Sequence, residues 1–252
     1  MIKNSLISVI TVVLNDEKNI LRTLRSVKNQ KSVKIEHIIV DGKSTDKTLR
    51  VVKKNIIKKS IIISEKDKNL YDAINKGIKR AKGKYIYLLH SGDIFCNNFV
   101  LYNKLKKLET SKLDFVFSNL FYYDFKKKKI TRKMQYSFFK YYFFKFGLQP
   151  PHCSFLIKKA VIKKIDYYST NYKIAGDFEF LIKLFKQPKV RFKYMNINSI
   201  YQNIGGISDT SLIKKKEVLR EICKILEKNK IFYMKLFFIL KLIFRFKEKF
   251  FR

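Results

Sequence analysis

Four apolar, mostly β-branched runs recur in the first 93 residues, separated by segments with helical spacing. The runs are ISVITVVL (7–14), IEHIIVDG (35–42), IIISE (61–65) and KYIYLLHSGD (84–93). Residues 19–29 and 71–83 carry apolar side chains at helical intervals; Gly83 is expected to end the second helix, and Ser44 or Thr45 to cap a helix between the two. This alternation predicts right-handed βαβ units, and therefore an α/β fold with a mainly parallel sheet flanked by helices.

Each of these runs ends on acidic or amide side chains. The residues at or just after the strand ends are Asn15, Asp16, Asp41, Glu65, Asp67 and Asp93. In an open parallel sheet the ligand binds beyond the carboxyl ends of the strands, so these side chains are expected to rim one crevice. Any one of them alone is more often a turn former or a helix cap, but their recurrence at four successive strands favours a site.

A rim of acids in a basic protein suits a divalent cation together with a phosphorylated ligand. No G-x-G-x-x-G follows the first run and no G-x-x-x-x-G-K-[ST] occurs, so a dinucleotide or P-loop site has no support. Mg²⁺ or Mn²⁺ typically uses one or two carboxylates and completes its shell with phosphate oxygens and water. Asp93, on a tight Ser-Gly turn, is placed to be that carboxylate.

Charge is the unusual bulk property of the chain. The 252 residues include 56 Lys and Arg against 20 Asp and Glu, a formal net charge of +36. Such an excess favours nucleic acid, anionic lipid or a phosphorylated substrate as partner. The three cysteines, Cys96, Cys153 and Cys223, show no C-x-x-C spacing, so we expect buried thiols in a reducing cytosol rather than a disulfide framework or a zinc site.

Several of these segments resemble family 2 glycosyltransferases, and closely the branch that acts in colanic acid, capsule and O-antigen assembly. The resemblance rests on VITVVLN, IIVDGKSTDKT, SEKDKNLYDAINKGIKRAKGKYIYLLHSGD, PPHCSFLIKK, YKIAGDFEFLIKLF and GGIS (205–208). It spans residues 5–225 and implies a GT-A (Rossmann-like) fold, a nucleotide-sugar donor, a divalent metal and inversion at the anomeric carbon.

The resemblance also implies roles for residues in the first half of the chain. Asp93 would be the metal ligand, matching the last carboxylate of the family's Asp-x-Asp motif, while Ser91 stands where the first carboxylate would be. Ile74 occupies a position where many relatives carry Arg. The implied donor-binding residues are Asn15, Asp41, Asp67, Tyr71, Asp72, Asn75, Ser91 and Gly92.

A second chemical site is expected in YKIAGDFEF. The resemblance implies that Asp177 is the general base that takes the proton from the acceptor hydroxyl, whereas Glu179 points elsewhere on the same helix. The alternative is that Asp177 merely caps that helix. His152 is a candidate for the acceptor or diphosphate, with a local hydrogen-bonding role as the alternative. His90 and His37 are expected to be structural.

Residues 115–150 interleave aromatic side chains with lysines. A single-stranded nucleic-acid platform, a lipid headgroup contact and an acceptor-side lid with a basic edge are all open interpretations. No RNA-binding or zinc-finger pattern favours nucleic acid, so no nucleic-acid partner is expected.

The C-terminal residues 231–252 are apolar but are interrupted by Lys235, Lys241 and Arg245, too often for a transmembrane helix. Cations on one side and Phe and Leu on the other predict an amphipathic helix at a membrane interface, with a core-packing helix as the alternative. We therefore divide the chain into a glycosyltransferase domain (1–225; donor half about 1–115, acceptor half about 116–225) and a membrane-interface tail (226–252).

These interpretations together predict an inverting, metal-dependent glycosyltransferase on the cytoplasmic face of the membrane. It would use a nucleoside-diphosphate sugar and a lipid-linked or membrane-borne saccharide in surface polysaccharide or lipooligosaccharide assembly, and it would bind an anionic membrane surface. The alternatives are a basic aromatic nucleic-acid-binding protein, and a catalytically weak relative that binds lipid or a complex.

Overall fold

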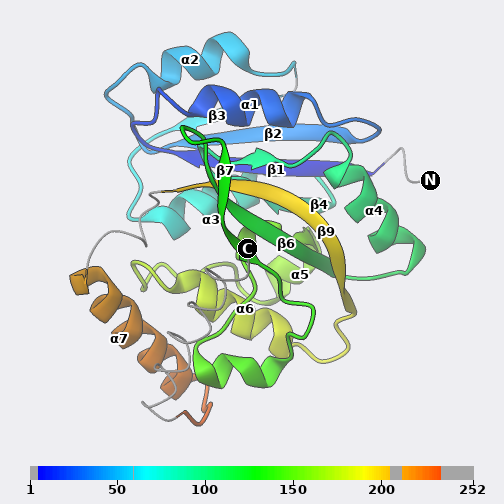
Figure 1. Ribbon diagram of the computed structural model, residues 1–252, viewed down its shortest axis with the longest axis vertical. Helices are drawn as coiled ribbons and strands as arrows, with labels where there is room; N and C mark the ends of the chain where they lie inside the picture. The colour runs from blue at the N-terminus through cyan, green and yellow to red at the C-terminus, as the bar shows by residue number, and fades with distance from the viewer. Residues whose placement is uncertain (1–4, 59, 205–211, 234–252) are drawn as a thin grey trace.

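The computed structural model describes residues 5–58, 60–204 and 212–233, and strands alternate with helices in its N-terminal part (Figure 1). The first elements are β1 (Leu6–Val13), α1 (Ile20–Lys28), β2 (Lys34–Asp41), α2 (Thr48–Asn55), β3 (Ile61–Ser64), α3 (Leu70–Arg80) and β4 (Tyr85–Leu88). The remaining elements are β5 (Ile94–Phe95), α4 (Val100–Thr110), β6 (Phe115–Asp124), β7 (Lys129–Met134), η2 (Tyr141–Phe146), η3 (His152–Ser154), β8 (Leu156–Lys158), α5 (Lys159–Lys164), α6 (Gly176–Lys186), β9 (Phe192–Asn203) and α7 (Leu212–Lys228).

The described strands form one sheet with the order β3-β2-β1-β4-β8-β6-β9-β5, and β7 pairs with β6. β3, β2, β1 and β4 run parallel to one another. β8 is antiparallel to both β4 and β6, and β5 is antiparallel to β9. The longest pairings, β1 with β2 and β6 with β9, are both parallel, which confirms a mainly parallel sheet.

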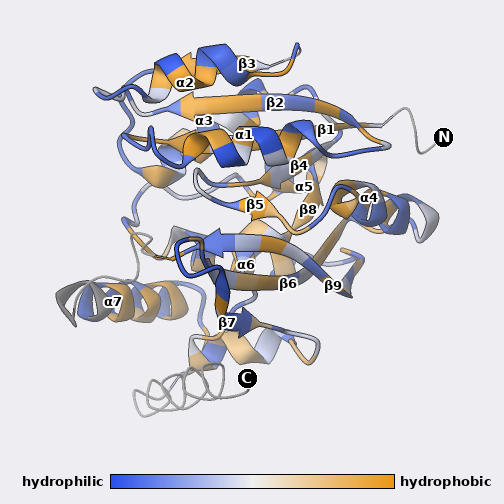
Figure 2. Ribbon diagram, turned by 45° about the horizontal axis from the view of Figure 1, so that its top comes forward, coloured by the Kyte–Doolittle hydropathy of each residue, from blue (hydrophilic) through white to orange (hydrophobic). Residues whose placement is uncertain are grey.

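Helices cover both faces of the parallel strands, and Figure 2 shows these strands as largely apolar. On one face α3 approaches β1 and β2 so closely that a Cβ on Gly77 would lie 2.5 Å from the Cγ2 of Ile10 and 3.2 Å from that of Val40. On the other face α1 and α2 bury a separate small cluster with the strands, made of Val13, Ile20, Leu24, Ile39 and Val52. Burial on both faces explains why these strands are continuous apolar runs.

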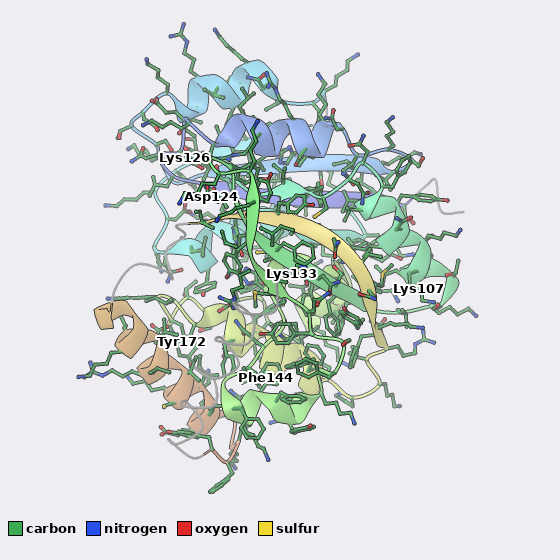
Figure 3. The ribbon with its side chains drawn as sticks, viewed as in Figure 1. Lys107, Asp124, Lys126, Lys133, Phe144 and Tyr172 are labelled. Carbon is green, nitrogen blue, oxygen red and sulfur yellow. The ribbon has the colours of Figure 1, made fainter. Side chains whose placement is uncertain are left out.

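The second part of the sheet builds an aromatic core. Phe115 and Phe117 of β6 are buried between neighbouring strands and helices, and Phe144 of η2 packs edge-on against Phe178 of α6 with ring centroids 5.5 Å apart. Figure 3 shows Phe144 on the α6 side of the sheet. Among the described aromatic residues of 115–150, only Phe138 and Tyr142 are exposed. Most rings of this segment are buried or half-buried, so the segment contributes to the core.

The β6–β7 hairpin reaches over α1. The guanidinium of Arg22, on α1, lies 4.1 Å from the centre of the Phe125 ring at the hairpin turn. Asp124 closes this turn by accepting the backbone N–H groups of Lys126 and Lys127 at 2.9 and 3.0 Å, and Figure 3 shows Asp124 and Lys126 at this end of the hairpin. The hairpin thus connects the aromatic half of the molecule to the first βα unit.

The predicted start of α2 is wrong. The helix begins at Thr48, and neither Ser44 nor Thr45 caps it. The Ser44 hydroxyl instead accepts the backbone N–H of Asn15 at 2.9 Å, and the backbone N–H of Thr45 donates to the Asn15 side chain at 2.8 Å. These side chains are used to connect two strand ends, so the helix starts only after them.

The predicted end of α3 is also wrong. The helix stops at Arg80, and Gly83 lies beyond it against β1. A Cβ on Gly83 would be 2.5 Å from the hydroxyl oxygen of Ser8 and 2.6 Å from its backbone nitrogen. This glycine is required by the close approach of two backbone segments rather than by a helix end.

The C-terminal part of the described chain is α7. The expected domain boundary after residue 225 falls inside this helix. The predicted amphipathic tail lies outside the described residues from residue 234 onwards, and so does the GGIS segment. Within the described ranges, no helix combines the length and the apolar character needed to cross a membrane.

Candidate active site

The carboxyl ends of β1 and β2 form a hydrogen-bonded corner. Asp41 is fully buried, and its Oδ2 accepts the backbone N–H of Ser44 at 3.1 Å and the hydroxyl of Ser64 at 2.7 Å. Its Oδ1 has no hydrogen-bond partner among the described residues. Asn15, in the left-handed conformation with φ of 49°, joins this corner through Thr45. The two residues expected to contact the nucleoside, Asn15 and Asp41, therefore lie together, and the buried Oδ1 of Asp41 can still accept a hydrogen bond.

Asp93 follows β4 on a turn in which Gly92 has a φ of 88°. The Asp93 side chain is buried; its Oδ1 accepts the backbone N–H of Asn203 at 3.0 Å, and its Oδ2 has no partner in the described part of the chain. Burial raises the pKa of the Asp93 carboxyl to about 8. A divalent cation would provide the missing partner and favour the ionised form, so the residues present fit a cation at Asp93.

Asp16 and Arg22 lie next to the Ser-Gly-Asp turn; Asp16 was expected in the acidic rim but was given no role in donor binding, and Arg22 was not predicted. The Ser91 hydroxyl donates to the Asp16 carboxylate at 2.6 Å, which brings a second acid next to the Ser-Gly-Asp turn. Burial lowers the pKa of Arg22, while attraction to Asp16 and Asp93 opposes that change. The position of Asp16 directly after Asn15 was the available signal; Arg22 gave none, because its neighbours come from distant segments.

The start of α3 gathers three of the predicted donor-binding residues. Asn69 caps the helix by accepting the backbone N–H groups of Tyr71 and Asp72 at 3.0 and 3.1 Å. Lys76 forms ion pairs with Asp67 at 2.6 Å and with Asp72 at 3.4 Å. The acids at this edge are therefore partly neutralised within the protein.

Asn75, on the same helix, does not join that rim. Its amide nitrogen donates to the Tyr168 carbonyl at 2.7 Å, and its amide oxygen accepts the Tyr168 backbone N–H at 3.0 Å. Both polar ends of the side chain are thus engaged with one backbone residue. These contacts anchor α3 to the segment before α6.

Asp177 lies in the first turn of α6, one residue inside the helix rather than at its cap. Its Oδ2 accepts the amide of Gln149 at 2.7 Å and lies 3.3 Å from Nδ1 of His152, and its Oδ1 accepts the Phe178 backbone N–H at 2.9 Å. The Tyr71 hydroxyl lies 3.4 Å from the same Oδ1. Burial raises the pKa of Asp177, but hydrogen bonds and charge from His152 and Gln149 outweigh it, so the pKa lies below its usual value.

The segment before α6 is fixed from two sides. A Cβ on Gly176 would lie 2.7 Å from the Tyr71 ring, so only glycine permits this packing. From α7, the carboxylate of Glu221 accepts three successive backbone N–H groups at 2.8, 3.0 and 2.7 Å, those of Lys173, Ile174 and Ala175. These contacts hold the backbone that leads into Asp177.

Glu179 lies on another side of α6, as the helical periodicity predicts. It is buried and forms ion pairs with Lys183 and Lys228, each at 3.3 Å. These partners connect α6 with α7. The two acids of the motif therefore have separate surroundings, with Asp177 beside a histidine and Glu179 beside lysines.

His90 and His152 contact each other through their rings. The charges of both histidines act on the Asp93 carboxyl, and that of His152 also acts on Asp177. Nε2 of His152 is 3.2 Å from Nε2 of His90 and 3.3 Å from the sulfur of Cys153. The charges of His90 and His152 also lower the pKa of Asp93, against the larger effect of burial. His90, expected to be structural, is thus part of the site, whereas His37 bonds to Thr11 in the core at 2.9 Å.

The sequence matches a family model and several curated proteins. The model described as glycosyl transferase family 2 matches residues 8–223. An uncharacterized glycosyltransferase of Mycobacterium tuberculosis is 31% identical over 184 residues, which cover 70% of this chain and 68% of the relative. A PGL/p-HBAD biosynthesis glycosyltransferase of Mycobacterium bovis is 26% identical over 220 residues, which cover 85% and 83%.

The fold matches solved structures of glycosyltransferases with the GT-A fold. A fragment of S. aureus TarS, residues 1–349, has a TM-score of 0.64 at 20% identity and covers 87% of this chain, which spans 65% of that one. The mannosyltransferase PcManGT from Pyrobaculum calidifontis, in complex with GDP-Man and Mn²⁺, has a TM-score of 0.64 at 14% identity, covering 88% and 64%. Because the family model matches residues 8–223, which are most of the chain, the chain belongs to glycosyl transferase family 2.

Proposed function

We propose that this chain transfers a sugar, with inversion, from a nucleoside-diphosphate sugar to a lipid-linked or membrane-borne saccharide. The observation that carries the proposal is the pair of acids on either side of the histidines. Asp93 has a buried carboxylate oxygen without a partner among the described residues, and Asp177 has a carboxyl whose pKa is held below its usual value. The first suits a cation that binds a diphosphate, and the second suits a base that is ionised at neutral pH.

On the donor side, the nucleoside would lie at the corner of Asn15 and Asp41, with the diphosphate near Asp93. Mg²⁺ or Mn²⁺ held by Asp93 would, when bound, offset the negative charge that develops on the departing diphosphate. Asp16 is connected to the same turn through Ser91 and supplies a second acid near the position where this chain lacks the first carboxylate of the family motif. Arg22, close to both acids, can balance their charge and meet a phosphate oxygen.

On the acceptor side, Asp177 would take the proton from the acceptor hydroxyl. The acceptor oxygen then forms a bond to the anomeric carbon while the bond from that carbon to the diphosphate oxygen breaks. Attack from the face opposite the diphosphate inverts the configuration, and the proton ends on Asp177. Gln149 and His152 orient the carboxylate, so that its remaining lone pairs face the acceptor.

The names of relatives support a lipid-linked acceptor. One is a PGL/p-HBAD biosynthesis glycosyltransferase. Another, from Methanococcus voltae, is a dolichyl N-acetyl-alpha-D-glucosaminyl phosphate glucuronosyltransferase, 38% identical over 115 residues that cover 41% of this chain and 36% of the relative. A net charge of +36 suits an anionic membrane surface. We therefore place the protein at the inner face of the cytoplasmic membrane, in surface polysaccharide or lipooligosaccharide assembly.

A panel of nucleotide sugars tests the proposal. UDP- and GDP-linked sugars are added to the full chain with Mn²⁺ or with a chelator, and thermal stabilisation and donor hydrolysis are measured. We expect at least one donor to stabilise the protein and to be hydrolysed slowly, with both effects requiring the metal. Absence of stabilisation and of hydrolysis with every donor would overturn the enzymatic proposal and favour a weak relative that binds lipid or a complex.

A further inference from the structure

Three potential metal ligands from two distant segments meet beside the proposed base. His90 follows β4, while His152 and Cys153 lie in η3, next to the strand that pairs with β4. One donor atom from each of the three residues lies within 4.8 Å of the other two. The resemblance seen in the sequence implies roles for Asp93 and Asp177 and makes His152 a candidate for the acceptor or diphosphate, but it gives no role to His90 or Cys153. Cys153 had been expected to be an inert thiol, because the sequence spacing of the cysteines gave no zinc signal.

Two of the three separations between the donor atoms are close to those of a tetrahedral zinc site, and the third is at most 4.8 Å. With Zn–N bonds of about 2.0–2.1 Å and Zn–S bonds of about 2.3 Å, two nitrogens are about 3.3 Å apart and a nitrogen and a sulfur about 3.5 Å apart. Here the two Nε2 atoms are 3.2 Å apart, and the Cys153 sulfur is 3.3 Å from Nε2 of His152. A cation can therefore bind with little rearrangement of the side chains.

The second ring nitrogen of His152 supports the same conclusion independently. Its Nδ1 lies 3.3 Å from Oδ2 of Asp177. A proton on Nδ1 donated to this carboxylate leaves Nε2 with its lone pair directed at His90 and Cys153. A carboxylate behind a histidine is the usual outer partner of a histidine that binds zinc.

All three ligands must be free of protons before they bind a cation, and the thiolate is the form of cysteine that binds metals. Protons and a cation therefore compete for this site, and cation binding should weaken as the pH falls.

We propose that His90, His152 and Cys153 form a binding site for a borderline-soft divalent cation of the Zn²⁺ class, separate from the hard-cation position at Asp93. Two imidazoles and a thiolate select Zn²⁺ or Co²⁺ over Mg²⁺, Mn²⁺ or Ca²⁺, which prefer oxygen ligands. Three protein ligands leave a fourth position for water or another small ligand. This inference does not depend on the proposed function, since it rests on the geometry of the three side chains.

Cobalt provides the direct test. Co²⁺ is titrated into the full-length, metal-stripped protein, and the absorption spectrum is followed for a thiolate-to-cobalt charge-transfer band in the near ultraviolet and for the visible bands of a tetrahedral ion. We expect both to saturate at one equivalent and to disappear when Zn²⁺ is added, whereas excess Mg²⁺ leaves them unchanged. If no charge-transfer band develops, the cluster is a hydrogen-bonded network only and the proposal is wrong.

Variants locate the site. Cys153→Ser should abolish the charge-transfer band, and His90→Asn should weaken Co²⁺ binding about tenfold or more. Asp177→Asn removes the outer partner of His152 and should weaken binding about 10–100-fold while the band remains. Cys96→Ser and Cys223→Ser are the matched controls, because these half-buried cysteines lie outside the cluster, and both should keep the band.

Two further measurements decide cases in which a variant is unstable. Thermal melting shows whether Cys153→Ser is folded; if it is not, protection of Cys153 from alkylation by one equivalent of Zn²⁺ in the unaltered protein takes its place. A Co²⁺ band that survives His90→Asn at full affinity, or one that is lost in Cys96→Ser, would overturn the assignment. Asp93→Asn should retain the band, which separates this site from the diphosphate cation.

Discussion

The parallel half of the sheet and the aromatic half contribute to the site in different ways. In residues 5–93 the important side chains follow strand ends; contacts between neighbouring strand ends, such as Asn15 with Thr45, position most of them, and Asn203 holds Asp93. In residues 115–228 the important carboxylate, Asp177, is positioned by Gln149, His152 and the Glu221-bound segment before it. The first half is a regular βαβ scaffold, while the second is held by contacts between distant segments.

The difference suggests that the two halves of the molecule have different roles in the reaction. We expect the parallel half to bind the donor and the aromatic half to handle the proton of the acceptor. Substitutions in the first half should then change donor affinity, and those in the second should change the rate of transfer. The following variants test that division, beginning with the largest expected effect.

Asp177→Asn should lower sugar transfer by about 10² or more, the usual scale for loss of a general base, while donor affinity stays nearly unchanged. The asparagine keeps the shape of the side chain but cannot take the proton. Transfer rates and donor affinity, measured by calorimetry, are compared for the same protein preparations. Glu179→Gln is the control and should have much less effect on transfer; if transfer survives in Asp177→Asn, the base lies elsewhere.

Asp93→Asn should change the affinity for the donor, which Asp177→Asn leaves nearly unchanged. We expect nucleoside diphosphate to bind about tenfold or more weakly in the presence of Mn²⁺, because a neutral amide is a poor ligand for a hard cation. Calorimetry with Mn²⁺ and with a chelator measures the effect. Asp114→Asn is the matched control. Asp114 lies just before β6, outside the acidic rim, and forms an ion pair with Lys158 at 2.8 Å. Equal affinity with metal and with chelator in the unaltered protein would remove Asp93 from the site.

Glu221→Ala should lower the transfer rate several-fold, because three backbone N–H groups before α6 lose their acceptor and Asp177 is positioned less well. Glu221→Gln keeps one acceptor oxygen and should restore part of the rate. The donor KM should not move in either variant. A change in KM with an unchanged kcat would show that α7 serves the donor side, which would break the proposed division.

Removal of residues 234–252 should have the smallest effect on chemistry. Donor hydrolysis should be unchanged, while binding to anionic vesicles weakens, because each cation near the surface adds roughly 1 kcal/mol of attraction. The cut after Tyr233 keeps the hydrogen bond of this residue to Glu227 at 2.6 Å. Co-sedimentation of both forms at low and high salt is the measurement, and equal pelleting of the two would mean that the predicted tail is not the membrane contact.

Much of the parallel half could be predicted, since its signals are local. Hydrophobic runs with acidic ends, separated by helical spacing, sufficed to place Asp41 and Asp93 at one edge of a sheet. The helix ends at Ser44 and Gly83 were mispredicted because residues with a strong local preference were used for contacts with other segments. Local propensity was therefore overridden wherever two strands or loops had to be connected.

The second half could not be predicted in the same way. The alternation of aromatic residues and lysines in residues 115–150 suggested a surface, yet β6 lies inside the sheet, and its phenylalanine rings are buried while Tyr122 and Tyr123 are half-buried. The meeting of His90 with His152 joins residues 62 positions apart, and no spacing rule connects them. Only the pairing of β4 with β8 brings these segments together.

The position of Glu221 in the chain also has a consequence for biosynthesis. The corner of Asn15 and Asp41 is complete once residue 64 has been made, because its partners are Ser44, Thr45 and Ser64. The backbone before Asp177 acquires its acceptor only when residue 221 has left the ribosome, and contacts over such separations form slowly. A nascent chain would thus form the corner proposed for the nucleoside before it fixes the backbone that leads into the proposed base, so that the transferase is assembled in the order in which its reaction proceeds.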